Sequence, residues 1–229
     1  MTDLLIDTVM QAARGDVAGY EATLEVVKAR HVACATELFS SGVAQAYGAA
    51  LEDDIRNLRD ILRAVSLMRY SGEKIVELVS GHGEIWSARM LTALFQEGGH
   101  DFAFVDARKV LFVDEGVESG PEIMWERSKA ALQALMAGTP TTCPVITGFI
   151  ASTSDGVATT LKRDGSDYSA SIFGRLLDAH GITIWTDVDG VLSADPRRVP
   201  EAKASQARVL WGGWVGTGRV GSDARILVL

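Results

Sequence analysis

Residues 144–148 read Pro-Val-Ile-Thr-Gly, a short apolar run that stops at a glycine. The same pattern recurs at 102–106, Phe-Ala-Phe-Val-Asp, and at 182–187, Ile-Thr-Ile-Trp-Thr-Asp. Each run has the length of a buried strand, and helical patterns lie between the runs, at 121–136 and 166–180. Strands that alternate with helices favour an α/β fold, with a three-layer α/β/α arrangement around a mainly parallel open sheet.

The carboxyl ends of these expected strands carry small or polar residues. Asp106, Gly148 and the pair Thr186-Asp187 fall there. Ligands of open α/β sheets bind at that edge, so we expect the site to lie along it.

The first hundred residues show helical spacing instead. Apolar residues recur on one face of three segments, Leu4–Met10, Tyr20–Leu38 and Val43–Met68, and we interpret these faces as core or helix–helix contacts. A further helix is expected to start with Ser71 as its N-cap and to be interrupted at Gly81.

Composition narrows the class of protein. The 229 residues include 22 basic and 30 acidic side chains, a formal net charge of −8, which argues against nucleic acid or an anionic membrane as the main partner. No apolar run approaches the roughly 20 residues that span a bilayer, and the start lacks the pattern of a signal peptide, so we expect a cytoplasmic protein. Cys34 and Cys143 are the only cysteines, which excludes a disulfide framework and a four-cysteine zinc site, and we expect no metal ligands in the chain itself.

Residues 79–88, Val-Ser-Gly-His-Gly-Glu-Ile-Trp-Ser-Ala, hold two glycines around His82 and then Glu84. The glycines can let backbone N–H groups approach a ligand, with Glu84 binding an ammonium group. A kinked helix with Glu84 as an N-terminal charge explains the pattern equally well. His82 is interpreted as a structural histidine.

Residues 159–170, Thr-Thr-Leu-Lys-Arg-Asp-Gly-Ser-Asp-Tyr-Ser-Ala, place Ser166 and Asp167 at the start of an expected helix, after two basic residues. A helix N-terminus beside cations favours an anion, and Arg163 can bind a carboxylate through two hydrogen bonds. The alternative is a capping turn with solvated charges; the density of matched features favours a functional site.

Two further patterns concern nucleotides. Residues 185–197 place several acids, a glycine and Asp-Pro-Arg after an expected strand, which suits a nucleotide loop if Mg²⁺ lies between acids and phosphates or the acids bind sugar and base; a polar turn is the alternative. The motif at 216–221, Gly-Thr-Gly-Arg-Val-Gly, matches a dinucleotide fingerprint literally, but only eight residues follow it, so a chance match in a glycine-rich tail is favoured.

Taken together, the motifs resemble the aspartate kinases, which have the amino acid kinase fold. The resemblance rests on 79–88, on Val-Ile-Thr-Gly-Phe-Ile at 145–150, on 159–170, and on 182–202, Ile-Thr-Ile-Trp-Thr-Asp-Val-Asp-Gly-Val-Leu-Ser-Ala-Asp-Pro-Arg-Arg-Val-Pro-Glu-Ala. The sequences of these motifs are most similar to the kinase part of bifunctional aspartokinase–homoserine dehydrogenases. The resemblance extends roughly from Thr2 to Lys203.

The resemblance implies that the protein phosphorylates the side-chain carboxylate of aspartate with ATP and Mg²⁺, the first step of lysine, threonine and methionine biosynthesis. It implies that Glu84 binds the amino group of aspartate and that Arg163 holds its α-carboxylate. Ser166 and Asp167 would complete that pocket, and Thr2 is a weaker candidate for a substrate contact. The ATP site would be lined by Thr186, Asp187 and Arg197. Intact members are expected to form homo-oligomers.

The sequence departs from the family at both ends. The Lys-Phe-Gly-Gly-Thr-Ser motif, whose lysine neutralises the transferring phosphate, does not occur, so the catalytic cation is unassigned. Leu192 stands where many members have tyrosine, and a glycine-rich run follows Lys203 in place of a Lys-Val-Leu-His-Pro-Arg-like motif. We therefore expect a partial kinase domain over 1–203 that lacks the N-terminal strands, and an atypical tail over 204–229.

Two other functions stay open. The chain can be a catalytically impaired fragment that binds aspartate or pairs with a full-length subunit. It can also be another member of the fold, such as a glutamate, acetylglutamate or nucleoside-monophosphate kinase, which the motif at 159–170 disfavours.

Overall fold

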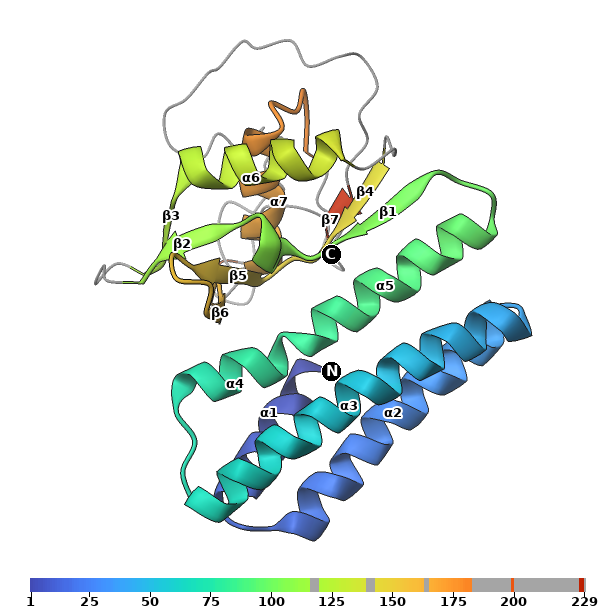
Figure 1. The fold of residues 1–229 in the computed structure, drawn as a ribbon, viewed down its shortest axis with the longest axis vertical. Helices are drawn as coiled ribbons and strands as arrows, with labels where there is room; N and C mark the ends of the chain where they lie inside the picture. The colour runs from blue at the N-terminus through green and yellow to red at the C-terminus, as the bar shows by residue number, and fades with distance from the viewer. Residues whose placement is uncertain (116–119, 139–142, 163–164, 183–198, 200–226, 229) are drawn as a thin grey trace.

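The computed structural model describes residues 1–115, 120–138, 143–162, 165–182, 199 and 227–228 (Figure 1). Its N-terminal part is a layer of three helices, α1 (Thr2–Ala13), α2 (Val17–Leu38) and α3 (Ser41–Met68), which confirms the three helical segments expected there. Asp16 caps α2 by accepting a hydrogen bond from the Gly19 amide at 2.9 Å. None of the described helices is long and apolar enough to cross a membrane.

Two consecutive helices lie between this layer and the sheets, as Figure 1 shows. They are α4 (Glu73–Ser80) and α5 (His82–Glu97), and the single residue Gly81 joins them with helical dihedral angles. The segment is thus a kinked helix, and the alternative of a glycine loop that binds a ligand through its backbone is wrong for Gly81, whose N–H donates to the Glu77 carbonyl. Ser71 is not the N-cap of α4; Gly72 holds that position.

The strands form two sheets. In the first, β1 (Phe102–Val105), β4 (Cys143–Ile146) and β7 (Leu227–Val228) are parallel in the order β1-β4-β7. In the second, the order is β3-β2-β5-β6, with β2 (Phe112–Asp114) parallel to β5 (Ile150–Thr153). Its outer strands, β3 (Glu122–Ile123) and β6 (Ala158–Thr160), are antiparallel to their neighbours. The expected strands at 102 and 144 are confirmed, whereas this mixed second sheet was not expected.

Helices α6 (Trp125–Ala137) and α7 (Gly165–Leu176) complete the fold, with α6 on the side of the sheets away from α5 (Figure 1). The expected helix from 121 starts four residues late, because Ile123 pairs with Val113 in the sheet instead. The helix expected to reach 180 ends at Leu176, and Asp178 adopts a left-handed backbone. The strand expected at 182–185 lies outside the described residues from 183 onward.

Helix α5 separates two apolar cores. Trp86 is buried in the core of the helical layer, which includes Leu24 and Val65, while its neighbour Ile85 belongs to the core of the sheets, with Val105 and Ile146. Because consecutive side chains are anchored on opposite sides, α5 cannot rotate about its axis without exposing one of them. The first turn of α5 is therefore held firmly in place.

Gly81 and Gly83 provide a matched test of the kink. A Cβ on Gly81 would lie 2.8 Å from Ile150 Cγ2 and 3.1 Å from the Glu77 carbonyl oxygen, whereas a Cβ on Gly83 would meet only ordinary contacts at 3.7–3.9 Å. We expect Gly81→Ala to lower the free energy of unfolding by about 1–3 kcal/mol. We expect Gly83→Ala to raise it by roughly 0.5–1 kcal/mol, because alanine favours the helix. Urea denaturation of both variants tests this, and equal effects would contradict it.

Candidate functional site

Glu84 lies in the first turn of α5 and is partly buried. Among the described residues, none forms a hydrogen bond or ion pair with its carboxylate. Burial raises the pKa of this carboxyl group to about 7, and the nearby N-terminal ammonium opposes that rise. A carboxylate that is taken out of water without a cation is unfavourable, so this position favours a ligand that brings a positive charge.

The start of α1 lies against this turn. Met1 Cγ and Cβ are 3.8 and 3.9 Å from the position that a Cβ on Gly83 would occupy. Thr2 is the first residue of α1, so the fold brings Thr2 and Glu84, two of the predicted substrate residues, to the same helix junction.

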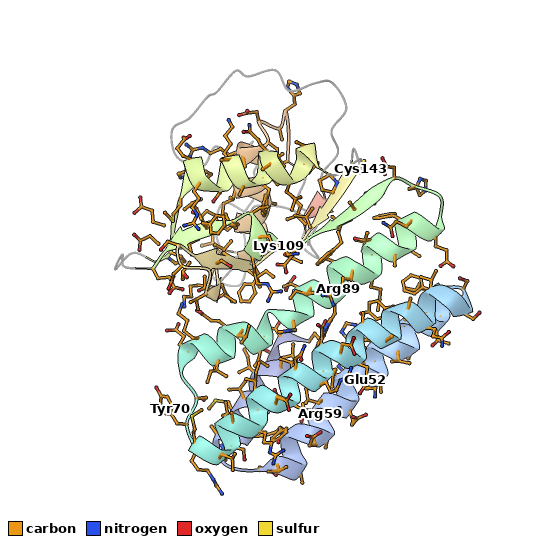
Figure 2. The ribbon with its side chains drawn as sticks, in the orientation of Figure 1. Glu52, Arg59, Tyr70, Arg89, Lys109 and Cys143 are labelled. Atoms are coloured by element: carbon orange, nitrogen blue, oxygen red, sulfur yellow. The ribbon has the colours of Figure 1, made fainter. Side chains whose placement is uncertain are left out.

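Helix α3 holds α5 two residues after Glu84. The Tyr47 hydroxyl donates to the Trp86 carbonyl oxygen at 3.2 Å, and His31 Nδ1 lies 2.9 Å from the same hydroxyl. Trp86 Nε1 donates to Asp54 at 2.9 Å, and Arg89 forms an ion pair with the same carboxylate oxygen. Figure 2 shows Arg89 directed from α5 into the space between the two helices. This clamp fixes α5 from the side of the helical layer.

The Tyr47 contacts also assign the proton on His31. The hydroxyl has one hydrogen, and the carbonyl can only accept, so His31 Nδ1 carries a proton and donates it to the hydroxyl oxygen. Nε2 is then an acceptor, and it is buried with no partner among the described residues. Burial, and to a lesser extent the N-terminal ammonium, lowers the pKa of His31.

Helix α7 is tied to the end of β4. The Ser169 hydroxyl accepts a hydrogen bond from the Phe149 amide at 2.8 Å, and the Phe149 carbonyl accepts one from Leu161 at 2.7 Å. Phe149 adopts a left-handed backbone with φ of 63°, which makes the tight turn after Gly148. These contacts place Ser169, in the second turn of α7, just beyond the carboxyl end of β4. The motifs named Gly148, but Phe149 and Ser169 were missed, because only the tertiary fold brings them together.

The predicted residues differ in what the structure describes. Asp167 is exposed in the first turn of α7, and Ser166 lies in the same turn. The remaining predicted residues lie outside the described part of the chain: Arg163, Thr186, Asp187 and Arg197.

Two residues near the site have structural roles. Asp106, at the carboxyl end of β1, is buried and binds Arg108 through Nε at 3.0 Å and Nη2 at 2.7 Å, so its carboxylate is already satisfied. His82 Nδ1 bonds the Leu78 carbonyl at 2.8 Å, which confirms the interpretation of a structural histidine. The described residues contain no group of three or more acidic, histidine or cysteine side chains that could hold a metal ion.

The family model for the amino acid kinase family matches residues 10–209. The chain belongs to the amino acid kinase family. The α/β fold expected from the sequence is therefore confirmed, and its helices and sheets correspond to the three-layer architecture of the family.

Curated relatives narrow the comparison. The chain is 41% identical over 202 residues to bifunctional aspartokinase/homoserine dehydrogenase 1 of Arabidopsis thaliana, covering 88% of this chain and 22% of the relative. It is 42% identical over 124 residues to bifunctional aspartokinase/homoserine dehydrogenase 2 of Escherichia coli, covering 54% of this chain and 15% of the relative. The chain thus spans less than a quarter of the length of these amino acid kinase relatives.

A solved structure of E. coli aspartokinase III in complex with lysine and aspartate matches with a TM-score of 0.72 at 27% identity, over 89% of this chain and 44% of that one. A second structure of the same enzyme, with aspartate and ADP, matches with a TM-score of 0.74 at 24% identity, over 88% of this chain and 44% of that one, and supports the fold.

The state of His31 predicts how stability depends on pH. Because its pKa is lowered in the folded chain, the unfolded chain takes up a proton first as pH falls below about 6.5, and the stability that His31 contributes is lost from there downward. We expect the destabilisation by His31→Phe, of roughly 1 kcal/mol at pH 7.5, to shrink at pH 5. Urea denaturation at both pH values measures this.

Comparing each variant with its parent at the same pH cancels the titration of Glu84, which has the opposite sign. His180, exposed after α7, supplies the control His180→Gln. A constant effect of His31→Phe across this range would contradict the assigned neutral state.

Proposed function

We propose that this chain is an aspartate kinase, or the aspartate-binding part of one, that transfers the γ-phosphoryl group of ATP to the side-chain carboxylate of aspartate. The observation that carries the proposal is Glu84, a partly buried carboxylate that forms no ion pair or hydrogen bond with the described residues. The relatives named aspartokinase, and the aspartokinase III structure with bound aspartate, support the choice of substrate.

The reaction depends more on the positioning of ATP and aspartate than on acid–base catalysis. A side-chain carboxylate oxygen of aspartate attacks the γ-phosphorus, a new P–O bond forms, and the bond to the β-phosphate oxygen breaks to release ADP. The attacking carboxylate is already deprotonated at neutral pH, so no general base is needed. The enzyme lowers the barrier by aligning the two substrates and by neutralising charge.

In this proposal Glu84 binds the α-ammonium of aspartate and Arg163 binds the α-carboxylate. Ser166 and Asp167 complete the pocket, with Thr2 near the ammonium. Two opposite charges at one end of the substrate leave its side chain directed toward ATP. This arrangement selects a free α-amino acid, because a peptide or an amide would lack one of the two charges.

ATP would be held by Thr186, Asp187 and Arg197. Mg²⁺ would accompany the ATP and shield the charge of its phosphates. We further propose that the reaction takes place in the cytoplasm and that the working enzyme is a homo-oligomer, although several plant relatives are named as chloroplastic.

The second candidate function is aspartate binding without phosphorylation. In this candidate, Glu84 and Arg163 bind aspartate but no cation neutralises the transferring phosphate, a lack that would cost a factor of about 10²–10³ in rate. Hydroxylamine traps an acyl phosphate as a hydroxamate, so hydroxamate formation that requires both ATP and aspartate supports the kinase. Calorimetric binding of aspartate without hydroxamate formation supports the second candidate. If the chain neither binds aspartate nor forms hydroxamate, both candidates are refuted.

Glu84→Gln tests the ammonium site. We expect the variant to weaken aspartate binding by a factor of 30 or more, on the order of 2–5 kcal/mol for one partner of a desolvated charge pair. In the parent, aspartate binding tightens as pH rises from 6 to 8, since the Glu84 proton must leave before the ammonium binds. The variant loses this dependence. Calorimetric titrations with aspartate at pH 6, 7 and 8 measure both effects.

The stability of the free chain supplies a second readout. The raised pKa means that ionised Glu84 destabilises the folded chain progressively as pH rises from 4.5 through 7, so Glu84→Gln is at least as stable as its parent at pH 8. Glu126, exposed in the first turn of α6, gives the control Glu126→Gln, which changes neither binding nor stability. Unaltered aspartate affinity in Glu84→Gln would refute the assigned role.

A further inference from the structure

Glu77 in α4 is a second buried carboxylate, with only 6% of its surface exposed. It differs from Glu84 because both of its carboxylate oxygens accept hydrogen bonds from described residues. Lys162 Nζ donates to one of its oxygens, while Thr159 donates to the other at 2.9 Å and Lys74 Nζ lies 3.4 Å from it. Glu73, one turn earlier, accepts from Lys162 at 2.6 Å. A buried carboxylate persists only where such partners are held in good geometry.

Lys162 reaches this cluster from an unfavourable backbone. Its φ is 64°, in the left-handed region that costs a side-chain-bearing residue roughly 1 kcal/mol and that glycine adopts freely. What the lysine adds over glycine is its ammonium group, which burial disfavours but whose hydrogen bonds to Glu73 and Glu77 raise its pKa. The strained position is explained by the two carboxylates that this ammonium binds.

Glu77 also holds the junction between α4 and α5. Its backbone carbonyl accepts from the Gly81 amide at 3.0 Å and from the Ser80 hydroxyl at 3.3 Å. Glu84 follows three residues after Gly81, and Arg163 follows Lys162 directly in sequence. Glu77 therefore contacts both segments that lead to the predicted aspartate-binding residues. Its side chain binds Lys162, which precedes Arg163, and its backbone holds the α4–α5 junction, which precedes Glu84.

We propose that Lys162 is a positioning residue for aspartate, whose ammonium group, bound between Glu77 and Glu73, fixes the start of the Arg163 segment against the helix pair that carries Glu84. The inference rests on the proposed function, in which these two residues bind the α-carboxylate and the α-ammonium of aspartate. Those two groups are attached to a single carbon atom, so their binding partners must keep a fixed separation. Loss of the Lys162 contacts changes the affinity for aspartate and leaves the nucleotide site unaffected.

Lys162→Met and Lys162→Gly remove the ammonium group, and in the glycine variant the relieved backbone strain offsets part of the stability lost with the ion pair. Lys162→Arg keeps a cation. Lys28→Met is the control: Lys28 also forms an ion pair with a glutamate, Glu52, but this pair joins α2 to α3 and lies outside the Glu77 cluster.

In the hydroxamate assay, we expect the methionine and glycine variants to raise KM for aspartate by on the order of 10- to 100-fold, with kcat changed much less and KM for ATP unchanged. Lys162→Arg restores most of the affinity, and Lys28→Met stays near the parent. Amide hydrogen exchange needs no turnover: the Leu161 amide, bonded to the Phe149 carbonyl, exchanges faster in the methionine and glycine variants only.

The two readouts separate this inference from the proposed function. A parent chain that neither binds nor phosphorylates aspartate refutes the function, and the exchange measurement still decides whether the tether exists. Equal exchange of Leu161 in Lys162→Gly and in the parent overturns the tether. Faster exchange with an unchanged KM for aspartate in an active chain overturns the positioning role.

Discussion

Glu84 forms no ion pair or hydrogen bond within the described part of the chain, and the candidate site is organised around its carboxylate. Its helix cannot turn or slide to bring the carboxylate into water, because Trp86 is buried in one core and Ile85 in the other. The free chain pays for this placement with a raised pKa. A ligand ammonium would offset this unfavourable burial, so the position favours a substrate with a positively charged group.

The supports of this turn come from distant parts of the sequence. Tyr47 and Asp54 hold α5 from the helical layer, and Ile150 packs against the kink from the sheet, where only a glycine fits. The N-terminal turn of α1 closes the junction from a third side. The supports thus come from three elements, α3, β5 and α1, and together they fix the position of the Glu84 carboxylate.

The sequence predicted the parts of the fold that local patterns determine. Long amphipathic segments indicated α1, α2 and α3, and continuous apolar runs indicated β1 and β4. It could not predict the second sheet, whose strands of two to four residues are defined by partners far along the chain, as when Ile123 pairs with Val113. Glu84 was identified from its motif, but its lack of an ion-pair partner among the described residues was visible only once the helices were packed. Arg163, Thr186, Asp187 and Arg197 remain predictions.

The contrast between Glu77 and Glu84 shows what separates a structural carboxylate from a binding one. Both are glutamates on the same kinked helix, with Glu77 buried and Glu84 partly buried. The Glu77 carboxylate contacts two lysines and a hydroxyl group. These contacts join α4 to β6 and to Lys162. Glu84 has none of these partners among the described residues, and its charge stays available. The residue type is the same in the two cases; the partners that the fold supplies decide which of them can bind a ligand.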